Sequence, residues 1–389
     1  MKKLMIIAAA LLLLLPLLAF AAGGKETQEK ASTTGTAKGS DIAPFIIEMR
    51  QGLDPYRGSI DYKGEYGAVP TWDTDLVLTV DEVNQIRAKK AKVGYVMDAA
   101  AGDHTNSLLK GMKDVFAQLG INLMGTVDPQ FDVEKERAGA ENFIAMGADL
   151  VIGAPIDPVA SAASFRPVLN AGKKFVIWSN IPKGYEYGKD FVGVSSAMAQ
   201  DLGRYSVQIL KEGVSSKTEV AYLFFDAKFW VVNLIDAMVK QELQKDPNLV
   251  IVEELGFSTE KECFDLMSAA IQRHPNIKRV YACWNVPAQF AADACKQANR
   301  PDIKIACFGV DEPTLIDILK GGNIMGTVSD DPYHLGANLA LLAGYGIIGK
   351  KAPEFTITPA IPITKTNLQA AWDITQKTPM PDSVKQFLK

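Results

Sequence analysis

Residues that mark catalytic and metal sites are scarce in this chain. Its 389 residues include only three histidines, His104, His274 and His334. None of them has a cysteine at zinc-site spacing, and no HExxH segment occurs, so no metal is expected. The GVSSA segment at 193–197 lacks the second glycine of a nucleophile elbow, and no histidine offers an evident base for it. The sequence therefore favours a protein that is not an enzyme.

Cysteine is also rare, and the four cysteines do not form a CxxC motif. They are Cys263, Cys283, Cys295 and Cys307. None stands near the N-terminus, which excludes a lipid-modified cysteine there. Four cysteines in an exported chain allow three pairings, whereas the apolar runs around Cys283 and Cys307 suit buried free thiols. The sequence leaves both interpretations open.

A phosphate-binding loop is absent as well. The segment 344–349 reads GYGIIG and is followed by Lys350, but no strand precedes it and Lys351 stands where Ser or Thr would bind magnesium. We predict a glycine-rich helix end instead. A nucleotide-dependent enzyme is disfavoured on this ground, and no cofactor is expected.

Positive charge is not in excess, since 41 Lys and Arg face 45 Asp and Glu. This balance disfavours nucleic acid as a partner. After the N-terminal segment, no apolar run reaches the roughly 20 residues of a membrane-spanning helix. No basic amphipathic stretch indicates binding to a lipid surface either.

One long apolar run is present, and it lies at the very start. Lys2 and Lys3 precede apolar residues from Leu4 to Phe20, and the run ends with an Ala-Phe-Ala pattern at 19–21. A membrane anchor is the alternative, but the basic start, small-residue end and polar continuation favour a secretory leader cleaved near Ala21. We therefore expect a soluble protein in the periplasm.

The organisation that follows is segmental. We assign 1–21 to the signal peptide, 22–44 to a polar flexible linker, and 45–90 to an irregular N-terminal arm with a short helix. That helix should start at Thr79, which forms a T-x-x-E capping box with Glu82. The remaining length exceeds one core, so two domains are expected.

From residue 92 onward, short apolar runs alternate with helical patterns. This alternation is typical of parallel sheets covered by helices on both faces. Ten strands exceed one comfortable sheet, so the predicted fold class is α/β with two doubly wound lobes. The predicted strands are 92–97, 122–127, 150–153, 174–178, 191–194, 219–225, 250–256, 279–284, 304–310 and 324–328.

Ligands of such sheets bind beyond the carboxyl ends of the strands. Polar and aromatic side chains there suit a sugar, because flat rings cover its apolar faces and carboxylates or amides accept and donate hydrogen bonds to its hydroxyls. Several of these residues could instead cap helices or pack in the core. The candidate ligand-binding residues are Asp98, Asp103, His104, Trp178, Asn180, Asp226, Phe229, Trp230, Trp284, Asn285, Asp311 and Asp330.

Several segments, in order, resemble the ribose- and galactose-type periplasmic binding proteins with the type 1 fold. The resemblance spans about 91–365. It rests on the strand and loop at 93–102, LVIGAPIDP at 150–158, HPN at 274–276 before the strand at 280–285, FGVD at 308–311 and the segment 326–332.

This resemblance implies lobe 1 at 91–194 plus 331–358 and lobe 2 at 195–330 plus 359–389. It also implies three crossings, near 194–196, 329–331 and 358–361, that form a hinge between the lobes. A ligand would bind in the cleft, and the protein, which we expect to be a monomer, would hand it to the membrane permease of an ABC importer.

Departures from the ribose-binding pattern bear on the ligand. His104 and Thr105 replace paired aromatics, Ser179 and Asn180 stand where an Asp-Arg pair often occurs, and 231–234 contains no arginine. The resemblance then favours an uncharged polyol or an atypical sugar over ribose. A nucleoside or autoinducer-type ligand, and a sensor that docks on a receptor domain, remain alternatives.

Overall fold

The computed structural model describes residues 41–98 and 102–388, all within one compact unit. The expected signal peptide and the expected linker up to residue 40 lie outside the described residues. At the end of that linker, Ile42 already forms a β-bridge with Thr79, and Ala43 is buried. The described body is therefore ordered from a few residues before residue 45.

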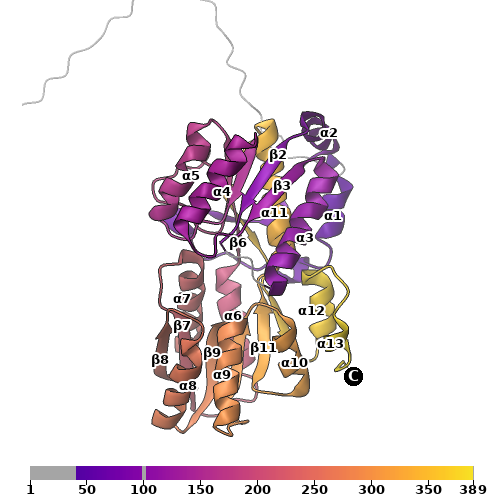
Figure 1. Cartoon of the computed structure of the whole chain (residues 1–389). Helices are drawn as coiled ribbons and strands as arrows, with labels where there is room; N and C mark the ends of the chain where they lie inside the picture. The colour runs from indigo at the N-terminus through magenta and orange to yellow at the C-terminus, as the bar shows by residue number, and fades with distance from the viewer. Residues whose placement is uncertain (1–40, 99–101, 389) are drawn as a thin grey trace, which may run out of the picture. The chain divides into compact units, whose positions relative to one another are not determined.

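Seven parallel strands form the sheet of lobe 1, in the upper half of Figure 1. The five inner strands are buried over nearly their whole length, as a parallel sheet covered on both faces requires, whereas the two edge strands are only partly buried. In spatial order the strands are β1 (Pro70–Trp72), β12 (Phe355–Thr358), β6 (Val194–Ala197), β5 (Lys174–Trp178), β4 (Leu150–Gly153), β2 (Lys92–Val96) and β3 (Asn122–Val127).

Six strands form the sheet of lobe 2, in the lower half of Figure 1. All neighbours are parallel except β13, which pairs antiparallel with β11. In spatial order they are β13 (Ile361–Thr364), β11 (Ile324–Ser329), β10 (Lys304–Phe308), β9 (Ile277–Trp284), β7 (Thr218–Phe225) and β8 (Leu249–Phe257). The predicted α/β class with two doubly wound sheets is confirmed.

Helices cover both faces of the lobe 1 sheet. One face packs against α2 (Val80–Lys89), α3 (Gly102–Leu119) and α11 (Pro332–Ile348), and the other packs against α4 (Val133–Ala145) and α5 (Ala160–Asn170). Helix α11 is buried over nearly its whole length, which explains why its sequence is apolar all round.

Lobe 2 follows the same plan around a single core. Helices α6 and α7 pack together on one face, α8 and α9 pack together on the sheet, and α10 follows β10. The bounds are α6 (Ala199–Leu210), α7 (Trp230–Lys245), α8 (Glu262–Arg273), α9 (Asn285–Gln297), α10 (Glu312–Lys320), α12 (Leu368–Thr375) and α13 (Asp382–Lys385).

Two local predictions about helix ends are confirmed. The Thr79 hydroxyl accepts a hydrogen bond from the Glu82 amide at 3.2 Å, while the Glu82 carboxylate accepts one from the Thr79 amide at 2.8 Å. This is the capping box that starts α2. At the other site, Gly349 has φ 67° and ends α11, so the GYGIIG segment is a helix end.

The chain passes between the sheets at three points. It leaves β6 for α6 after Ala197, leaves β11 for α11 through Asp330 and Asp331, and leaves β12 for β13 through residues 359–360. The first crossing lies slightly later than expected, because β6 covers 194–197 rather than 191–194. Residues 191–192 are apolar, as a strand would be, but only Phe191 pairs there, through a single bridge to Tyr187.

The N-terminal arm is more regular than its sequence indicated. It contains α1 (Pro44–Met49), three short 3-10 helices and β1, which adds an edge strand beside β12. The 3-10 helices are η2 (Asp54–Tyr56), η3 (Glu65–Gly67) and η4 (Asp73–Asp75). The fully buried Asp73 holds the arm together, because Arg50 and Arg57 both pair with its carboxylate. Such pairing depends on tertiary contact and leaves no periodic signal in the sequence.

The four cysteines are free and buried, so the free-thiol interpretation holds. Burial raises the pKa of Cys263, Cys295 and Cys307 to about 12, which keeps these thiols protonated and unreactive. Among the described residues, no helix combines the length and apolar character needed to cross a membrane.

Candidate functional site

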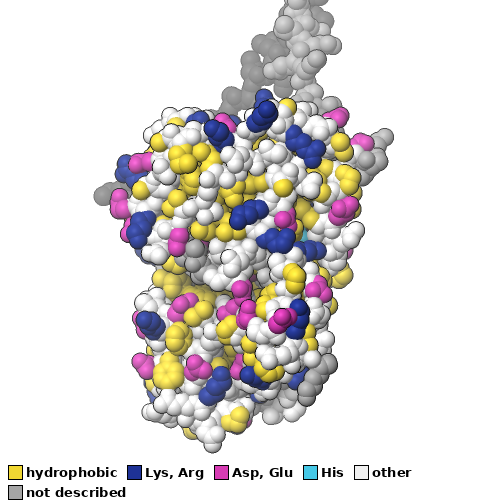
Figure 2. All heavy atoms as spheres, turned by 45° about the vertical axis from the view of Figure 1, so that its right-hand side comes forward, with side chains coloured by type: hydrophobic (Ala, Val, Ile, Leu, Met, Phe, Trp, Pro, Cys, Tyr) yellow, Lys and Arg dark blue, Asp and Glu magenta, His cyan; other side chains and the backbone are white. Residues whose placement is uncertain are grey.

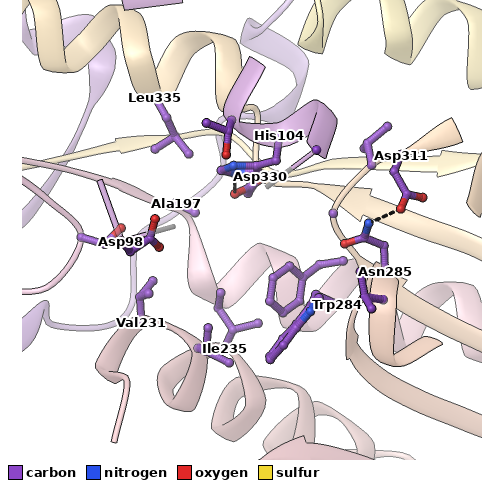
Figure 3. Close-up of a pocket in the computed structure, with 18 of the residues that line it drawn as sticks. Asp98, His104, Ala197, Val231, Ile235, Trp284, Asn285, Asp311, Asp330 and Leu335 are labelled. Atoms are coloured by element: carbon purple, nitrogen blue, oxygen red, sulfur yellow. Dashed lines mark hydrogen bonds and ion pairs between the residues drawn. The ribbon is translucent and has the colours of Figure 1, made fainter. Parts of the chain in front are cut away.

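A cavity of about 360 Å³ lies where the carboxyl ends of both sheets face each other. Its size falls in the range of small-molecule pockets, roughly 300–1,000 Å³. Both lobes and two of the hinge crossings contribute side chains to it. In Figure 3, Val231 and Ile235 project from one helix toward the same space as Trp284, while Asp98, His104 and Asp330 lie across from them.

Nine of the twelve predicted residues line this cavity. Residues that the strand-end rule selected, up to 232 positions apart in the chain, therefore lie around one cavity. The nine are Asp98, Asp103, His104, Trp178, Phe229, Trp284, Asn285, Asp311 and Asp330.

His104 and Asp330 form a hydrogen-bonded pair at the hinge. His104 Nε2 lies 2.8 Å from Asp330 Oδ2, and the imidazole stacks on Trp178 with ring centroids 5.8 Å apart. Burial alone would lower the pKa of His104, but the carboxylates of Asp330 and Asp98 together raise it above its ordinary value. The other oxygen of Asp330, Oδ1, is buried and has no hydrogen-bond partner among the described residues.

Asp311 is both a helix cap and part of the cavity wall. One of its oxygens accepts a hydrogen bond from the Thr314 amide at 3.0 Å, which caps α10. Its carboxylate also accepts hydrogen bonds from the side-chain amides of Asn285, at 2.5 Å, and Gln289, at 2.8 Å. A side chain at Gly309 would lie 2.9 Å from Asn285 Oδ1, so glycine at φ 86° lets this network form.

Aromatic side chains form much of the remaining wall. Trp284 contacts Phe225 and Phe257 edge-on, with centroids 5.3 Å from each, and its indole N–H donates to Glu260 at 2.7 Å. Across the cavity, Phe131 and Phe229 meet edge-to-face at 6.1 Å. Rings held in this way offer flat apolar faces to a ligand.

The charge of the cavity wall is acidic. Five carboxylates line it, those of Asp98, Asp103, Glu260, Asp311 and Asp330, and none of the described lining residues is Lys or Arg. Burial and the nearby charges of Glu312 and Asp311 raise the pKa of Asp103, although the Glu312 amide partly offsets this. On the face shown in Figure 2, acidic side chains gather along the upper part of the lower lobe, whereas the upper lobe carries both acidic and basic ones. An anionic ligand would meet repulsion here.

Three predicted residues do not line the cavity. Asp226 is exposed at the end of β7. Asn180 is buried and hydrogen-bonds to the backbone of Pro155 and Val231, and Trp230 packs edge-on against Phe355 at 6.0 Å. Each follows a strand or begins a helix as predicted, but local backbone geometry turns its side chain elsewhere.

The cavity also contains residues that the sequence did not suggest. Phe131 and Glu260 follow β3 and β8, the strands at the edges of the two sheets, so the strand-end rule would have found them had it been applied to every strand. Ile235 lines the cavity from within α7, and no sequence signal distinguishes it from a core residue.

Comparison with known proteins shows which family has this architecture. Residues 93–351 match the model of the periplasmic binding protein domain. The chain belongs to this family. The match begins after the N-terminal arm and ends before β12. No curated protein matches the chain in sequence.

Solved structures of periplasmic binding proteins share the fold at low sequence identity. The 5-methylthioribose transporter solute-binding protein of Thermotoga lettingae, solved with 5-methylthioribose, superposes with a TM-score of 0.63 at 21% identity, covering 77% of this chain and 97% of that one.

Two further structures agree. A Bacillus halodurans ABC transporter solute-binding protein with bound myo-inositol gives a TM-score of 0.64 at 18% identity, covering 73% and 98%. The periplasmic binding protein of the arabinose ABC transporter of Shewanella sp. ANA-3, bound to L-arabinofuranose, gives 0.65 at 20%, covering 74% and 96%. These periplasmic binding proteins match over nearly their whole length, whereas about a quarter of this chain has no counterpart in them.

Proposed function

We propose that this protein is the solute-binding component of an ABC importer and binds a small uncharged sugar or polyol in the cavity between its lobes. The observation that carries the proposal is the wall itself. Aromatic rings face carboxylates and an amide at the strand ends of both lobes, and Asp330 Oδ1 is buried there with no hydrogen-bond partner in the described part of the chain. A ligand hydroxyl donating to that oxygen would remove the cost of leaving it unsatisfied.

The acidic wall supports an uncharged ligand over a phosphorylated or carboxylated one. Carboxylates accept hydrogen bonds from hydroxyls, and such charge-assisted bonds are about twice as strong as neutral ones. The solved relatives bind 5-methylthioribose, myo-inositol and L-arabinofuranose, which share a ring or chain rich in hydroxyls.

A thermal-shift panel tests this proposal directly. The compounds are 5-methylthioribose, myo-inositol, L-arabinose and ribose, with ribose 5-phosphate as the anionic control. A ligand at 100 times its Kd stabilises the folded state by about 2.7 kcal/mol. We expect a rise of several degrees in Tm for at least one neutral compound and none for the phosphate. No shift with any neutral compound, confirmed by calorimetry, would refute the proposal.

A nucleoside is the second candidate ligand, favoured by the half-buried faces of Trp178 and Trp284 in the cavity. Aromatic faces stack on bases as readily as on sugar rings. Adenosine and uridine belong in the same panel. A larger shift with a nucleoside than with any sugar would assign the cavity to nucleosides.

The rest of the proposal concerns the protein's setting. We propose that the secretory leader exports the chain to the periplasm, that it works as a monomer without catalysing a reaction, and that a permease takes over its ligand. The lobes, 91–194 with 331–358 and 195–330 with 359–389, would move as units about the crossings. Stimulation of a reconstituted permease and ATPase by the loaded protein tests transport, and binding to a receptor domain instead would indicate sensing.

A further inference from the structure

The start of helix α7 makes an unusual set of contacts. The helix packs on β7, β8 and β9 and so belongs to lobe 2. Yet its N-cap, Phe229, and its first two residues, Trp230 and Val231, each contact a residue of lobe 1. Figure 1 shows the upper end of α7 beneath the upper lobe. The two lobes therefore meet at this helix end beside the cavity. They also meet elsewhere, for example where the Glu312 amide of α10 donates to Asp103 of α3 at 3.3 Å.

The polar part of this contact is a hydrogen bond from the Val231 amide to Asn180 Oδ1 at 3.1 Å. Amides in the first turn of a helix have no acceptor within the helix. The N-cap of α7, Phe229, has no side chain able to supply one. Asn180 thus does what an N-cap asparagine normally does, but from the opposite lobe.

Asn180 is held in position for this bond. Only 4% of its surface is exposed, and its Nδ2 donates to the Pro155 carbonyl at 2.9 Å, which fixes the direction of Oδ1. Ser179 before it has φ 62°, and the Ile181 amide after it donates to the buried Glu65 carboxylate at 2.5 Å. An ordered acceptor of this kind loses little entropy when the helix end reaches it.

The apolar part consists of two aromatic contacts on either side of that bond. Trp230 packs edge-on against Phe355 and reaches the lobe 1 core. Phe229 meets Phe131 at the cavity, although Phe131 remains 60% exposed with this contact in place. Separation of the lobes would expose these rings and leave the Asn180 oxygen without its donor.

We propose that Asn180 caps helix α7 across the lobes and, with Trp230, forms a latch that holds the lobes at the separation seen here. Asn180 is a positioning residue, because it does not line the cavity but places Phe229 and Val231, which do. Any effect of this latch on ligand release rests on the proposed function. The latch itself consists of contacts within the protein and requires no ligand.

The test measures the distance between the lobes without ligand. Cysteines introduced at the exposed Val159 of lobe 1 and Val250 of lobe 2 carry spin labels, since the four native cysteines are buried. Pulsed dipolar spectroscopy then compares the parent with Asn180→Ala and with Val231→Pro. Proline lacks the amide hydrogen and is tolerated in a first helical turn, as Pro313 is in α10.

We expect both variants to shift the distance distribution to longer and broader values. The double variant should shift it no further, because both changes remove the same bond. The matched control is Asn233→Ala. Asn233 contacts the same helix start, accepting from the Phe229 amide at 3.1 Å, but acts entirely within lobe 2. That control should keep the parent distance.

Distances unchanged in both single variants, or shifts that add in the double variant, would overturn the latch. Thermal unfolding shows whether each variant is folded, and Trp230→Ala provides an independent route if Asn180→Ala is not. The sugar panel decides a separate matter. If no compound binds while the distances still shift, the proposed function fails and the latch stands.

Discussion

The two walls of the cavity are built differently. In the lobe 2 wall, Asp311 is bonded to Asn285, Gln289 and the amide of Thr314, and Glu260 is bonded to Trp284. At the hinge, Asp330 is bonded to His104 through one oxygen and keeps the other buried without a partner among the described residues. The carboxylates of the lobe 2 wall therefore already have hydrogen-bond donors from the protein. At the hinge, one carboxylate oxygen of Asp330 is left to accept from a ligand.

The position of His104 depends in turn on a close helix contact in lobe 1. Helix α3, which carries His104, and α11, which follows Asp330, approach so closely that a side chain at Gly336 would lie 1.9 Å from the Leu108 carbonyl oxygen. A side chain at Gly111 would meet the Tyr333 carbonyl at the same distance. The hinge-side pair is thus aligned by backbone packing, and the lobe 2 pair by side-chain hydrogen bonds.

Gly336→Ala should have the largest effect, because backbone atoms of α3 cannot yield as a flexible side chain can. Overpacking of a core typically costs about 1–3 kcal/mol and here should reach or exceed that range. The matched control is Gly344→Ala in the same helix, where the nearest atom is the end of the Ile86 side chain at 3.0 Å. Denaturant unfolding measures both. Equal losses would show that the α3–α11 contact is not especially restrictive.

Asp311→Ala should lower stability and binding together. Loss of the α10 cap costs about 0.5–2 kcal/mol, and loss of the carboxylate leaves the amides of Asn285 and Gln289 unpaired. Affinity should fall by about 1–3 kcal/mol. Asp311→Asn serves as control, since it retains an oxygen for the cap. Undiminished affinity in the alanine variant would remove Asp311 from the site.

Asp330→Asn should separate binding from stability. The variant keeps the shape of the side chain and an oxygen beside His104, and Oδ1 has no partner to lose among the described residues, so Tm should change less than in Asp311→Ala. Affinity for the neutral ligand should fall about tenfold, equivalent to about 1.4 kcal/mol. NMR titration should also show a lower pKa for His104, because the Asp330 carboxylate helps to raise it. A loss of stability as large as that of Asp311→Ala would erase the contrast between the walls.

The smallest expected effect concerns Glu65 in η3, whose carboxylate binds the Ile181 amide of the loop that follows Trp178. Burial raises its pKa to about 7, although the Ile181 amide offsets part of the rise. The folded state therefore binds a proton that the unfolded state releases at lower pH, so this contribution is complete below about pH 4.5 and is lost as pH rises through 7. Raising pH from 6 to 8 should cost about 1 kcal/mol or less after solvent screening.

Glu65→Gln should remove that part of the pH dependence while keeping a hydrogen-bond acceptor for the Ile181 amide. Denaturant unfolding at the two pH values, for the parent and the variant, measures the difference. Parallel pH profiles in the two proteins would mean that Glu65 does not titrate in this range.

Much of the fold was accessible from the sequence, and the exceptions have physical causes. Strands β4 and β5 have the predicted limits because buried parallel strands need unbroken apolar runs. Strand β3 also has its predicted limits, although it is a partly exposed edge strand. The predicted range of strand β6 was about three residues too early, because the buried positions of the strand include the polar Ser195 and Ser196, which hydrogen-bond near the hinge. Strand β1 was missed because it forms only through pairing with β12, whose residues lie some 285 positions later.

The candidate site divides in the same way. By itself the sequence determined that polar and aromatic residues would gather at the strand ends, because parallel strands place their carboxyl ends on one edge. Only the tertiary structure decided which side chains face the cavity. Asp311 and Asn180 both follow strands, yet the first meets Asn285 in the wall, while the left-handed turn at Ser179 directs the second to the end of α7. Such choices depend on where the other lobe lies, and no local pattern encodes that.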